Sequence, residues 1–232
     1  MPDGANAPAA RPGPLRFRGF VLDPLQLDAV REAANVGACN AAMALSGLTG
    51  QRVNVEPPAV AVRPLAELLA GLADPGARAA AVVDTVLGDL AGQVVFVMPQ
   101  AAPEAAPGPA HTSGFTRLDE LEPGMFRHAA DLVIGAYIDH IGGMLGLVLS
   151  TVPGIPAIHE AGELAAGLAC ALDGGARFAF CVDSRFSLAQ TGQRLQGHFL
   201  FLPEQQSLPL IIGALFGARG EIIRTIERIN EQ

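Results

Sequence analysis

An internal repeat restricts the fold of this chain more than any other feature of its sequence. A shift of 96 positions carries Arg31 onto Arg127 and Asn35 onto Asp131. The same ungapped register also pairs Gly47 with Gly143, Gly50 with Gly146, Pro57 with Pro153, Glu67 with Glu163, and 71–73 with 167–169. Self-similarity at a fixed spacing indicates duplicated structural units. We therefore predict a tandem duplication, with two equivalent long helices related by a pseudo-twofold axis.

Hydrophobic periodicity predicts the same order of elements in each half: a long helix, strands, a short helix and more strands. Asp23 and Pro24 fit the cap and first turn of a helix that runs to about Ser46. Each half ends in an apolar strand that begins at Gly and closes at Pro, at 92–99 and at 197–203. We expect an α+β fold with a mostly antiparallel shared sheet and the two long helices together on one face.

Composition marks the boundaries of the folded part. The first residues are rich in Ala, Pro and Gly, which predicts a flexible tail, and a second Pro/Ala-rich stretch near the middle predicts a linker or surface loop. The expected divisions are a tail at 1–15, a domain at 16–216 with halves 16–98 and 115–216, a loop at 99–114, and a C-terminal helical extension at 217–232.

Charge and composition exclude several classes of function. The net charge of −8 makes nucleic acid an improbable partner. All 15 basic residues are Arg, so the chain has no Lys for a Schiff base or for a phosphate-binding loop. No signal peptide or membrane-spanning stretch is visible, and we expect a cytoplasmic protein without a membrane anchor.

The three cysteines, Cys39, Cys170 and Cys181, are scattered and form no CxxC pair. This spacing argues against a disulfide framework and against a thiolate zinc site. We expect all three to be reduced core residues.

One side of the first long helix carries the polar groups that could do chemistry. Asp28, Glu32, Asn35 and Cys39 follow at intervals of four, three and four residues, which places them on one face. Small residues surround them, so another protein could approach this surface closely. A carboxylate can pair with a cation, and a carboxamide can hold a water in a defined orientation. Taken alone, a Glu-x-x-Asn pair is common on helix surfaces and identifies no function.

A metal site in the second long helix is not supported by its sequence. His128, Asp131, Asp139 and His140 are the potential ligands there. His128 and His140 are twelve residues apart, about 18 Å along one helix, which is too far to share one ion. We therefore expect no metal and no cofactor of the chain's own. Serine hydrolase and nucleotide-binding motifs are also absent from the sequence.

The longer pattern Asp28-x3-Glu32-x2-Asn35-x22-Pro58, with the helix sequence REAANVGACNAAMALSGLTG, resembles the CheC, CheX and FliY family of chemotaxis phosphatases, and CheC in particular. The resemblance extends from about Pro24 to Leu215. It implies a CheC-like fold and the removal of phosphate from the aspartyl phosphate of a CheY-like response regulator.

The resemblance also implies roles for single residues. Asn35 would orient the attacking water, and Glu32 would pair with a Lys of the regulator, which also contributes the Mg²⁺. Asp28 and Pro58 occupy possible supporting positions of the signature, but helix surface charge is the better explanation of Asp28, and a strand start or turn is the better explanation of Pro58.

The second copy departs from the signature. His128 and Asp131 replace the Glu-x-x-Asn pair, and Gly124 stands at the upstream acidic position. A protonated His would repel a Lys, and an ionised Asp cannot donate a hydrogen bond. We expect this second site to be inactive.

Two further expectations concern partners. The resemblance implies the receptor deamidase CheD as a partner beside the regulator. A non-catalytic adaptor that binds the phosphorylated regulator or CheD is the alternative function, because the related switch protein FliM binds the regulator through a similar fold.

Overall fold

The fold is described from a computed structural model of the chain. The described residues are 16–17, 20–21, 24–71, 74–99, 123–172, 178–190, 192, 194–207, 210–211 and 213. The expected tail at 1–15, most of the expected loop at 99–114 and the expected extension at 217–232 lie outside these residues.

Each half of the chain contains a long helix, two short strands, a short helix and two long strands, in that order. The first half is α1 (Pro24–Thr49), β3 (Val53–Val55), β4 (Ala59–Pro64), α2 (Leu65–Ala70), β5 (Arg78–Gly88) and β6 (Gly92–Pro99). The second half is α3 (Pro123–Leu145), β7 (Leu149–Val152), β8 (Ala157–Glu160), α4 (Ala161–Ala171), β9 (Phe178–Leu188) and β10 (Arg194–Pro203). The small strands β1 (Arg16–Phe17) and β2 (Phe20–Val21) pair with each other, and a 3₁₀ turn spans Gln205–Ser207.

The long and short strands of both halves form one eight-stranded antiparallel sheet, in the order β3-β9-β10-β6-β5-β7. Strand β4 also pairs with β9, and β8 also pairs with β5. The short strands of each half therefore lie on the long hairpin of the other half. Exchanging every strand with its counterpart leaves the strand order unchanged, so the sheet has the same arrangement on either side of the central β6–β10 pair.

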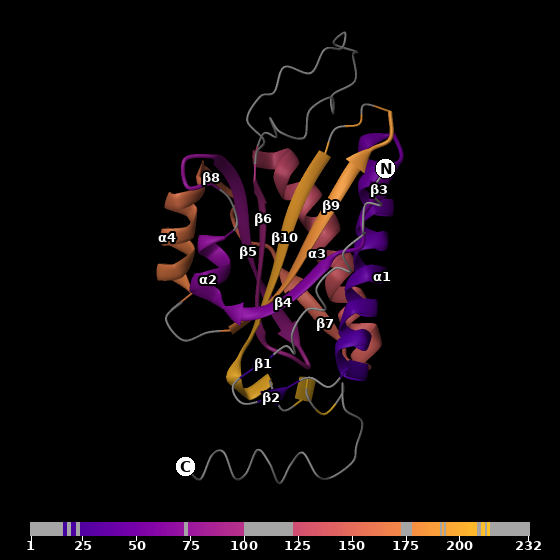
Figure 1. The fold of residues 1–232 in the computed structure, drawn as a ribbon, viewed down its shortest axis with the longest axis vertical. Helices are drawn as coiled ribbons and strands as arrows, with labels where there is room; N and C mark the ends of the chain where they lie inside the picture. The colour runs from indigo at the N-terminus through magenta and orange to yellow at the C-terminus, as the bar shows by residue number, and fades with distance from the viewer. Residues whose placement is uncertain are drawn as a thin grey trace, which may run out of the picture.

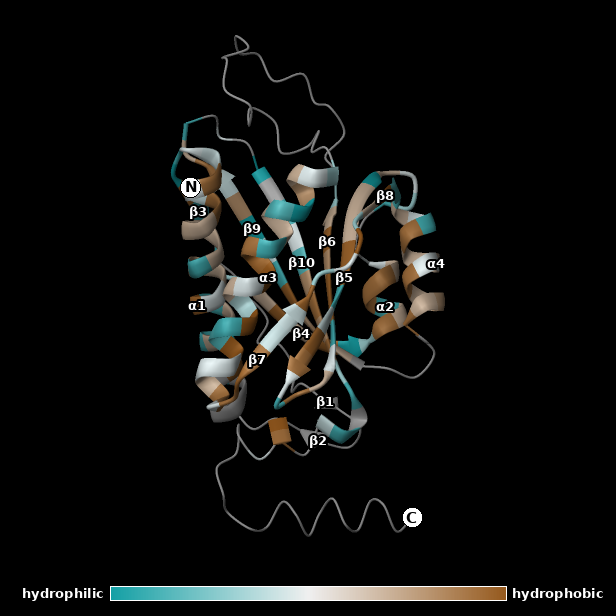
Figure 2. Cartoon of the chain, turned by 180° about the vertical axis from the view of Figure 1, so that it is seen from behind, coloured by the Kyte–Doolittle hydropathy of each residue, from teal (hydrophilic) through white to brown (hydrophobic). Residues whose placement is uncertain are grey.

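The sheet is covered on both faces (Figure 1). A larger apolar core lies under the long helices α1 and α3, and a smaller one lies under the short helices α2 and α4. Strand β5 supplies both cores by alternation, since Ala80 and Val82 belong to the larger core and Ala79 and Ala81 to the smaller. Figure 2, seen from behind, shows the central strands as mostly hydrophobic. The fold is thus three-layered, with the antiparallel sheet in the middle.

Both long helices end in the same way. Each is followed by a glycine in the left-handed region, Gly50 at φ 66° and Gly146 at φ 68°. Such a residue closes a helix without the steric cost that a Cβ would carry. The Ser46 hydroxyl accepts a hydrogen bond from the Val53 amide at 2.9 Å and so ties α1 to β3. The first helix ends at Thr49, directly before Gly50, rather than at about Ser46 as expected.

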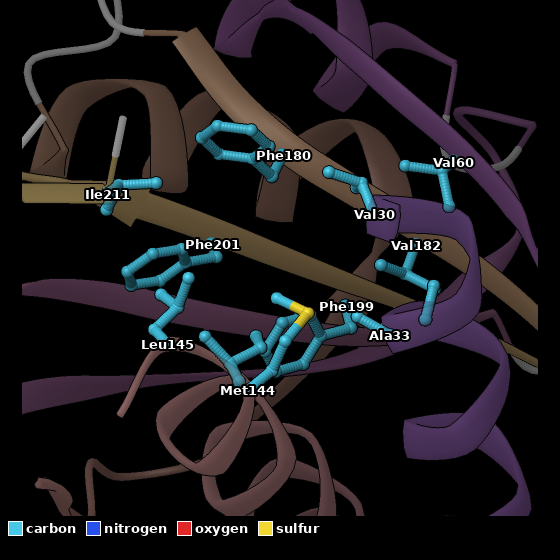
Figure 3. A pocket seen from close by; sticks show the side chains of 12 residues that line it. Val30, Ala33, Val60, Met144, Leu145, Phe180, Val182, Phe199, Phe201 and Ile211 are labelled. Carbon is cyan, nitrogen blue, oxygen red and sulfur yellow. The ribbon is translucent and has the colours of Figure 1, made fainter. Parts of the chain in front are cut away.

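An apolar pocket lies between the long helices and the sheet (Figure 3). Its lining is Val30, Ala33, Ala34, Val60, Ile141, Met144, Leu145, Phe180, Val182, Phe199, Phe201 and Ile211. None of these side chains can act as an acid, a base or a nucleophile. Chemistry therefore has to be sought outside this pocket.

The expectation that all three cysteines are core residues is wrong. Cys181 is buried, but Cys39 and Cys170 are exposed. Cys39 continues the outward polar face of α1, and Cys170 lies near the C-terminal end of the short helix α4. None of the helices within the described ranges contains a stretch that is both long and apolar enough to cross a membrane.

Candidate functional site on the first long helix

Helix α1 separates its small apolar residues from its polar ones. The buried side consists of Ala33, Ala34, Ala38, Ala41, Ala42 and Leu45. The exposed side carries Glu32 and Asn35 together with Asp28 and Cys39. The structure thus places the four residues of the sequence pattern on one outward face of one helix.

Glu32 and Asn35 have free polar atoms. Among the described residues, neither side chain takes part in a hydrogen bond or an ion pair. Asp28 faces Arg31 one turn away at 3.5 Å, in a loose pair whose carboxylate is 73% exposed. Such an exposed pair contributes little to stability. The carboxylate of Glu32 and the amide of Asn35 therefore remain available to a partner molecule.

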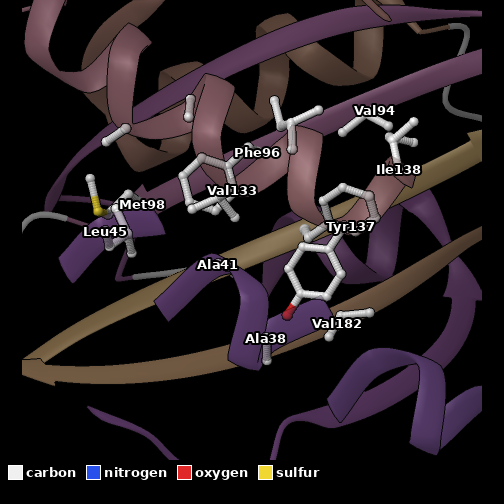
Figure 4. Close-up of a cluster of buried hydrophobic side chains, with 14 of the residues drawn as sticks. Ala38, Ala41, Leu45, Val94, Phe96, Met98, Val133, Tyr137, Ile138 and Val182 are labelled. Carbon is white, nitrogen blue, oxygen red and sulfur yellow. The ribbon is translucent and has the colours of Figure 1, made fainter. Parts of the chain in front are cut away.

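A close helix contact holds the backbone beneath these two residues. Gly37, two residues after Asn35, packs against the ring of Tyr137 on α3, and a Cβ at Gly37 would lie only 2.5 Å from Tyr137 Cδ1. Tyr137 lies in a cluster of buried hydrophobic side chains (Figure 4). Its hydroxyl and Ser184 Oγ are 2.6 Å apart in a buried hydrogen bond. The Tyr137 ring also stacks on Phe199 with centroids 4.6 Å apart. Burial raises the pKa of Tyr137 to about 12, although the bond to Ser184 acts in the opposite direction.

The corresponding turn of α3 is built differently. Arg127 makes two hydrogen bonds to Asp84 of β5, at 2.7 and 2.9 Å, and a third to Asp131. Asp84 is 1% exposed and also accepts a hydrogen bond from the Gly154 amide at 2.9 Å. The hydrogen bond to Asp84 raises the pKa of Arg127 further above its usual range, against the effect of burial. Asp131 is therefore part of a structural ion-pair network, whereas its counterpart Asn35 has no hydrogen-bond or ion-pair partner within the described ranges.

Sequence reasoning missed this network. The available signal was Asp84 itself, a charged residue in the middle of an otherwise apolar strand, where a buried carboxylate requires a partner. Arg127 could not be assigned as that partner, because it lies 43 residues away in the sequence.

The remaining candidate residues are distributed as follows. Pro58 directly precedes β4 and is half-buried, while Gly124 is exposed in the first turn of α3. His128 and Asp139 are exposed on α3, and His140 is half-buried. None of these α3 residues belongs to a group of potential metal ligands within the described part of the chain. The structure does group three other residues, Cys181, Asp183 and His198, which the sequence pattern did not indicate.

Comparison with known proteins shows which family the stretch around this helix is similar to. Residues 25–62, which include Glu32, Asn35 and Pro58, match the CheC-like family. The resemblance to the CheC family is confirmed. The chain is also 24% identical to the CheY-P phosphatase CheC of Bacillus subtilis over 196 residues, which cover 82% of this chain and 93% of that protein.

Two solved structures show a similar fold. FliY of Thermotoga maritima matches with a TM-score of 0.62 and 15% identity, covering 84% of this chain and 98% of that one. The FliM middle domain of H. pylori matches with a TM-score of 0.52 and 12% identity, covering 83% and 99%. At these identities the likeness concerns the fold. The expected α+β architecture with an antiparallel sheet is confirmed.

Proposed function

We propose that this chain is a chemotaxis phosphatase that accelerates hydrolysis of the aspartyl phosphate of a CheY-like response regulator. Its similarity to a protein named CheY-P phosphatase supports the proposal. The single observation that carries it is the pair Glu32 and Asn35, which are exposed, adjacent on α1 and without partners among the described residues. A surface site of this kind suits a macromolecular substrate, because the substrate provides the opposite wall.

The proposed mechanism divides the chemistry between the two proteins. The regulator brings the acyl phosphate, a Lys and its bound Mg²⁺, and the last supplies charge stabilisation when present. Asn35 inserts its amide next to the phosphoryl group, where the carbonyl accepts a hydrogen bond from water and the NH₂ donates one to an oxygen acceptor. This fixes the water in line with the phosphorus–oxygen bond that breaks. The products are inorganic phosphate and the free aspartate of the regulator.

Glu32 acts as the docking residue in this proposal. Its carboxylate lies one turn before Asn35 and pairs with the Lys of the regulator, which fixes the distance between amide and phosphoryl group. Asp28 adds negative charge to the same face, and Pro58 supports the strand beside the helix. The absence of Lys from this chain is consistent with the regulator supplying that cation.

The second half contributes no active site in this proposal. Asp131 has lost the donor capacity of an amide, and Arg127 holds its carboxylate in the network with Asp84. His128 replaces the docking carboxylate. Each chain therefore has one site that promotes hydrolysis of a phosphoryl group.

We also infer that the two halves arose by tandem duplication. The repeated element order, the exchange-symmetric strand order and the equivalent glycines Gly50 and Gly146 support this inference. The chain is expected to work in the cytoplasm, where phosphorylated response regulators and CheD are its candidate partners.

Decay of a phosphorylated CheY-type regulator, followed with and without this chain, tests the proposed activity. We expect faster decay with the wild type and loss of the acceleration in the double variant Glu32→Ala, Asn35→Ala. The matched control is Glu67→Ala, Asn54→Ala, which removes the same side chains from exposed positions of α2 and β3. If the double site variant accelerates decay as well as wild type does, the mechanism is wrong.

The same preparation separates hydrolysis from mere binding. An adaptor of the kind suggested by the FliM-like fold would bind the phosphorylated regulator without releasing phosphate. Binding without phosphate release would support this alternative. Co-purification with CheD tests the second proposed partner, and its absence would remove that partner only.

A further inference from the structure

Antiparallel pairing of β9 and β10 gathers three side chains that can ligate a metal. Cys181 and Asp183 are two residues apart on β9, so both project from the same face of the sheet. His198 of β10 lies directly opposite Asp183 in the strand register. This face is the one that carries the short helices, because Cys181 belongs to the smaller core. The cluster is thus on the opposite side of the sheet from Glu32 and Asn35.

The potential ligand atoms converge on one point. The Cys181 sulfur, a carboxylate oxygen of Asp183 and a ring nitrogen of His198 all lie within 4.8 Å of one another. His198 Nδ1 is 2.5 Å from Asp183 Oδ1, and the Cys181 thiol donates to the same oxygen at 3.2 Å. Cys181 and His198 are buried, whereas the Asp183 side chain is 39% exposed and leaves a path from solvent.

We propose that Cys181, Asp183 and His198 form a binding site for a borderline-soft divalent metal ion of the Zn²⁺ type. Thiolate, imidazole and carboxylate are the ligands that such ions take, and three protein ligands leave a fourth position for water. Calcium and magnesium are disfavoured, since they require sets of oxygen ligands.

The charges of the site balance around such an ion. Metal ligation requires the thiolate form of Cys181 and the ionised carboxylate of Asp183. A divalent cation displaces the thiol proton, which goes to solvent. The two positive charges then meet one thiolate and one carboxylate, giving a neutral site in a partly buried position.

The Nε2 atom of His198 has the same hydrogen-bonding status in the metal-free and the metal-bound site. This atom is buried without a partner among the described residues. A metal on Nδ1 requires the proton on Nε2, and a metal-free Nδ1–H donor to Asp183 leaves Nε2 as an unpaired acceptor. Either tautomer leaves this atom unpaired, so metal binding creates no additional unsatisfied group. The proposal also revises the sequence-based expectation of a metal-free chain.

Titration of the chelator-treated full chain with Co²⁺ tests the site, because thiolate ligation gives a near-ultraviolet charge-transfer band. We expect the band to saturate at one equivalent in the wild type and to be absent from Cys181→Ser. Cys170→Ser is the matched control, since it removes an exposed cysteine and should leave the band unchanged. Phosphatase activity is a separate readout from the opposite face, so the two proposals can fail independently.

A second variant keeps the test decisive if Cys181→Ser does not fold. Asp183→Asn preserves the side-chain volume and should weaken Co²⁺ binding by at least about tenfold, because even the loss of a residue that only orients a ligand costs about 10- to 100-fold in metal affinity. Absence of the band from the wild type, its survival in Cys181→Ser, or unchanged affinity in Asp183→Asn would overturn the proposal.

Discussion

At the scale of single residues, one amide distinguishes the two halves. Asn35 and Asp131 occupy corresponding positions in the repeat, but Asn35 has no partner in the part of the chain that the structure describes, whereas Asp131 is paired with Arg127. The loss of the Glu-x-x-Asn pair in the second half was predictable from the sequence. The ion-pair network that engages Asp131 was not, because its anchor Asp84 is brought to Arg127 by the fold rather than by helix periodicity.

Asp84 is predicted to be a major contributor to stability. Replacing it in Asp84→Asn leaves Arg127 without its bidentate partner, since Asp131 supplies a single exposed carboxylate oxygen. Breaking such a buried pair should lower the free energy of unfolding by about 3 kcal/mol, measured by urea denaturation. The exposed Asp139→Asn should change it by less than about 0.5 kcal/mol. Equal losses of unfolding free energy in the two variants would show that the buried network contributes no more to stability than an exposed carboxylate does.

Tyr137 should titrate well above an ordinary tyrosine. It is the only Tyr and the chain has no Trp, so tyrosinate absorbance reports this side chain alone. Its folded pKa is raised to about 12, against about 10 in the unfolded chain. The resulting stabilisation is complete below pH ~10 and is lost as the pH rises toward 12.

The variant Tyr137→Phe tests the direction in which this stabilisation changes with pH. Tyr137→Phe should be less stable than wild type at neutral pH, by about 1–3 kcal/mol, because the buried Ser184 hydroxyl loses its partner. The gap should narrow as the pH rises from ~10 toward 12. A tyrosine that titrates at its unfolded value in the native protein would contradict this burial.

At the scale of elements, local pattern predicted some boundaries and missed others. Strand β6 spans Gly92–Pro99, as expected from its Gly and Pro. Strand β10 begins at Arg194 instead of the expected Gly197, because its ladder with β9 continues to the Arg194–Ser187 pair. The partners of β3 and β4 were beyond sequence reasoning, since these strands pair with β9 of the other half.

The contact between α1 and α3 is predicted to position the site. Gly37→Ala places a methyl group 2.5 Å from Tyr137 Cδ1, so the helices must separate. We expect a loss of about 1–3 kcal/mol in the free energy of unfolding and slower hydrolysis of the phospho-regulator. In the same helix, a Cβ at Gly47 meets nothing within 4 Å.

Gly47→Ala is therefore the control for this contact. It should raise stability by up to ~1 kcal/mol through helix preference and leave activity unchanged. If both variants behave alike in thermal or urea unfolding, close packing of the two helices at Gly37 does not position the site.

At the scale of the whole molecule, the two halves share one sheet but differ in what they expose. Each half lays its short strands on the hairpin of the other, so neither half completes its sheet alone. The repeat indicated this equivalence from sequence. It did not indicate the exchange of strands, which is a property of pairing between distant segments. The two halves share this architecture, but within the described ranges only the first carries an exposed Glu-x-x-Asn pair without partners, which leads to the central claim of a single working site.

That claim is tested most directly by measuring phospho-regulator decay with Asn35→Ala beside His128→Ala. The two substitutions remove exposed side chains from corresponding turns of α1 and α3. We predict that Asn35→Ala reduces the acceleration by about 100-fold, the scale of a lost water-positioning group, whereas His128→Ala leaves it unchanged. Full acceleration by Asn35→Ala, or an equal loss in His128→Ala, would contradict a single site on the first helix.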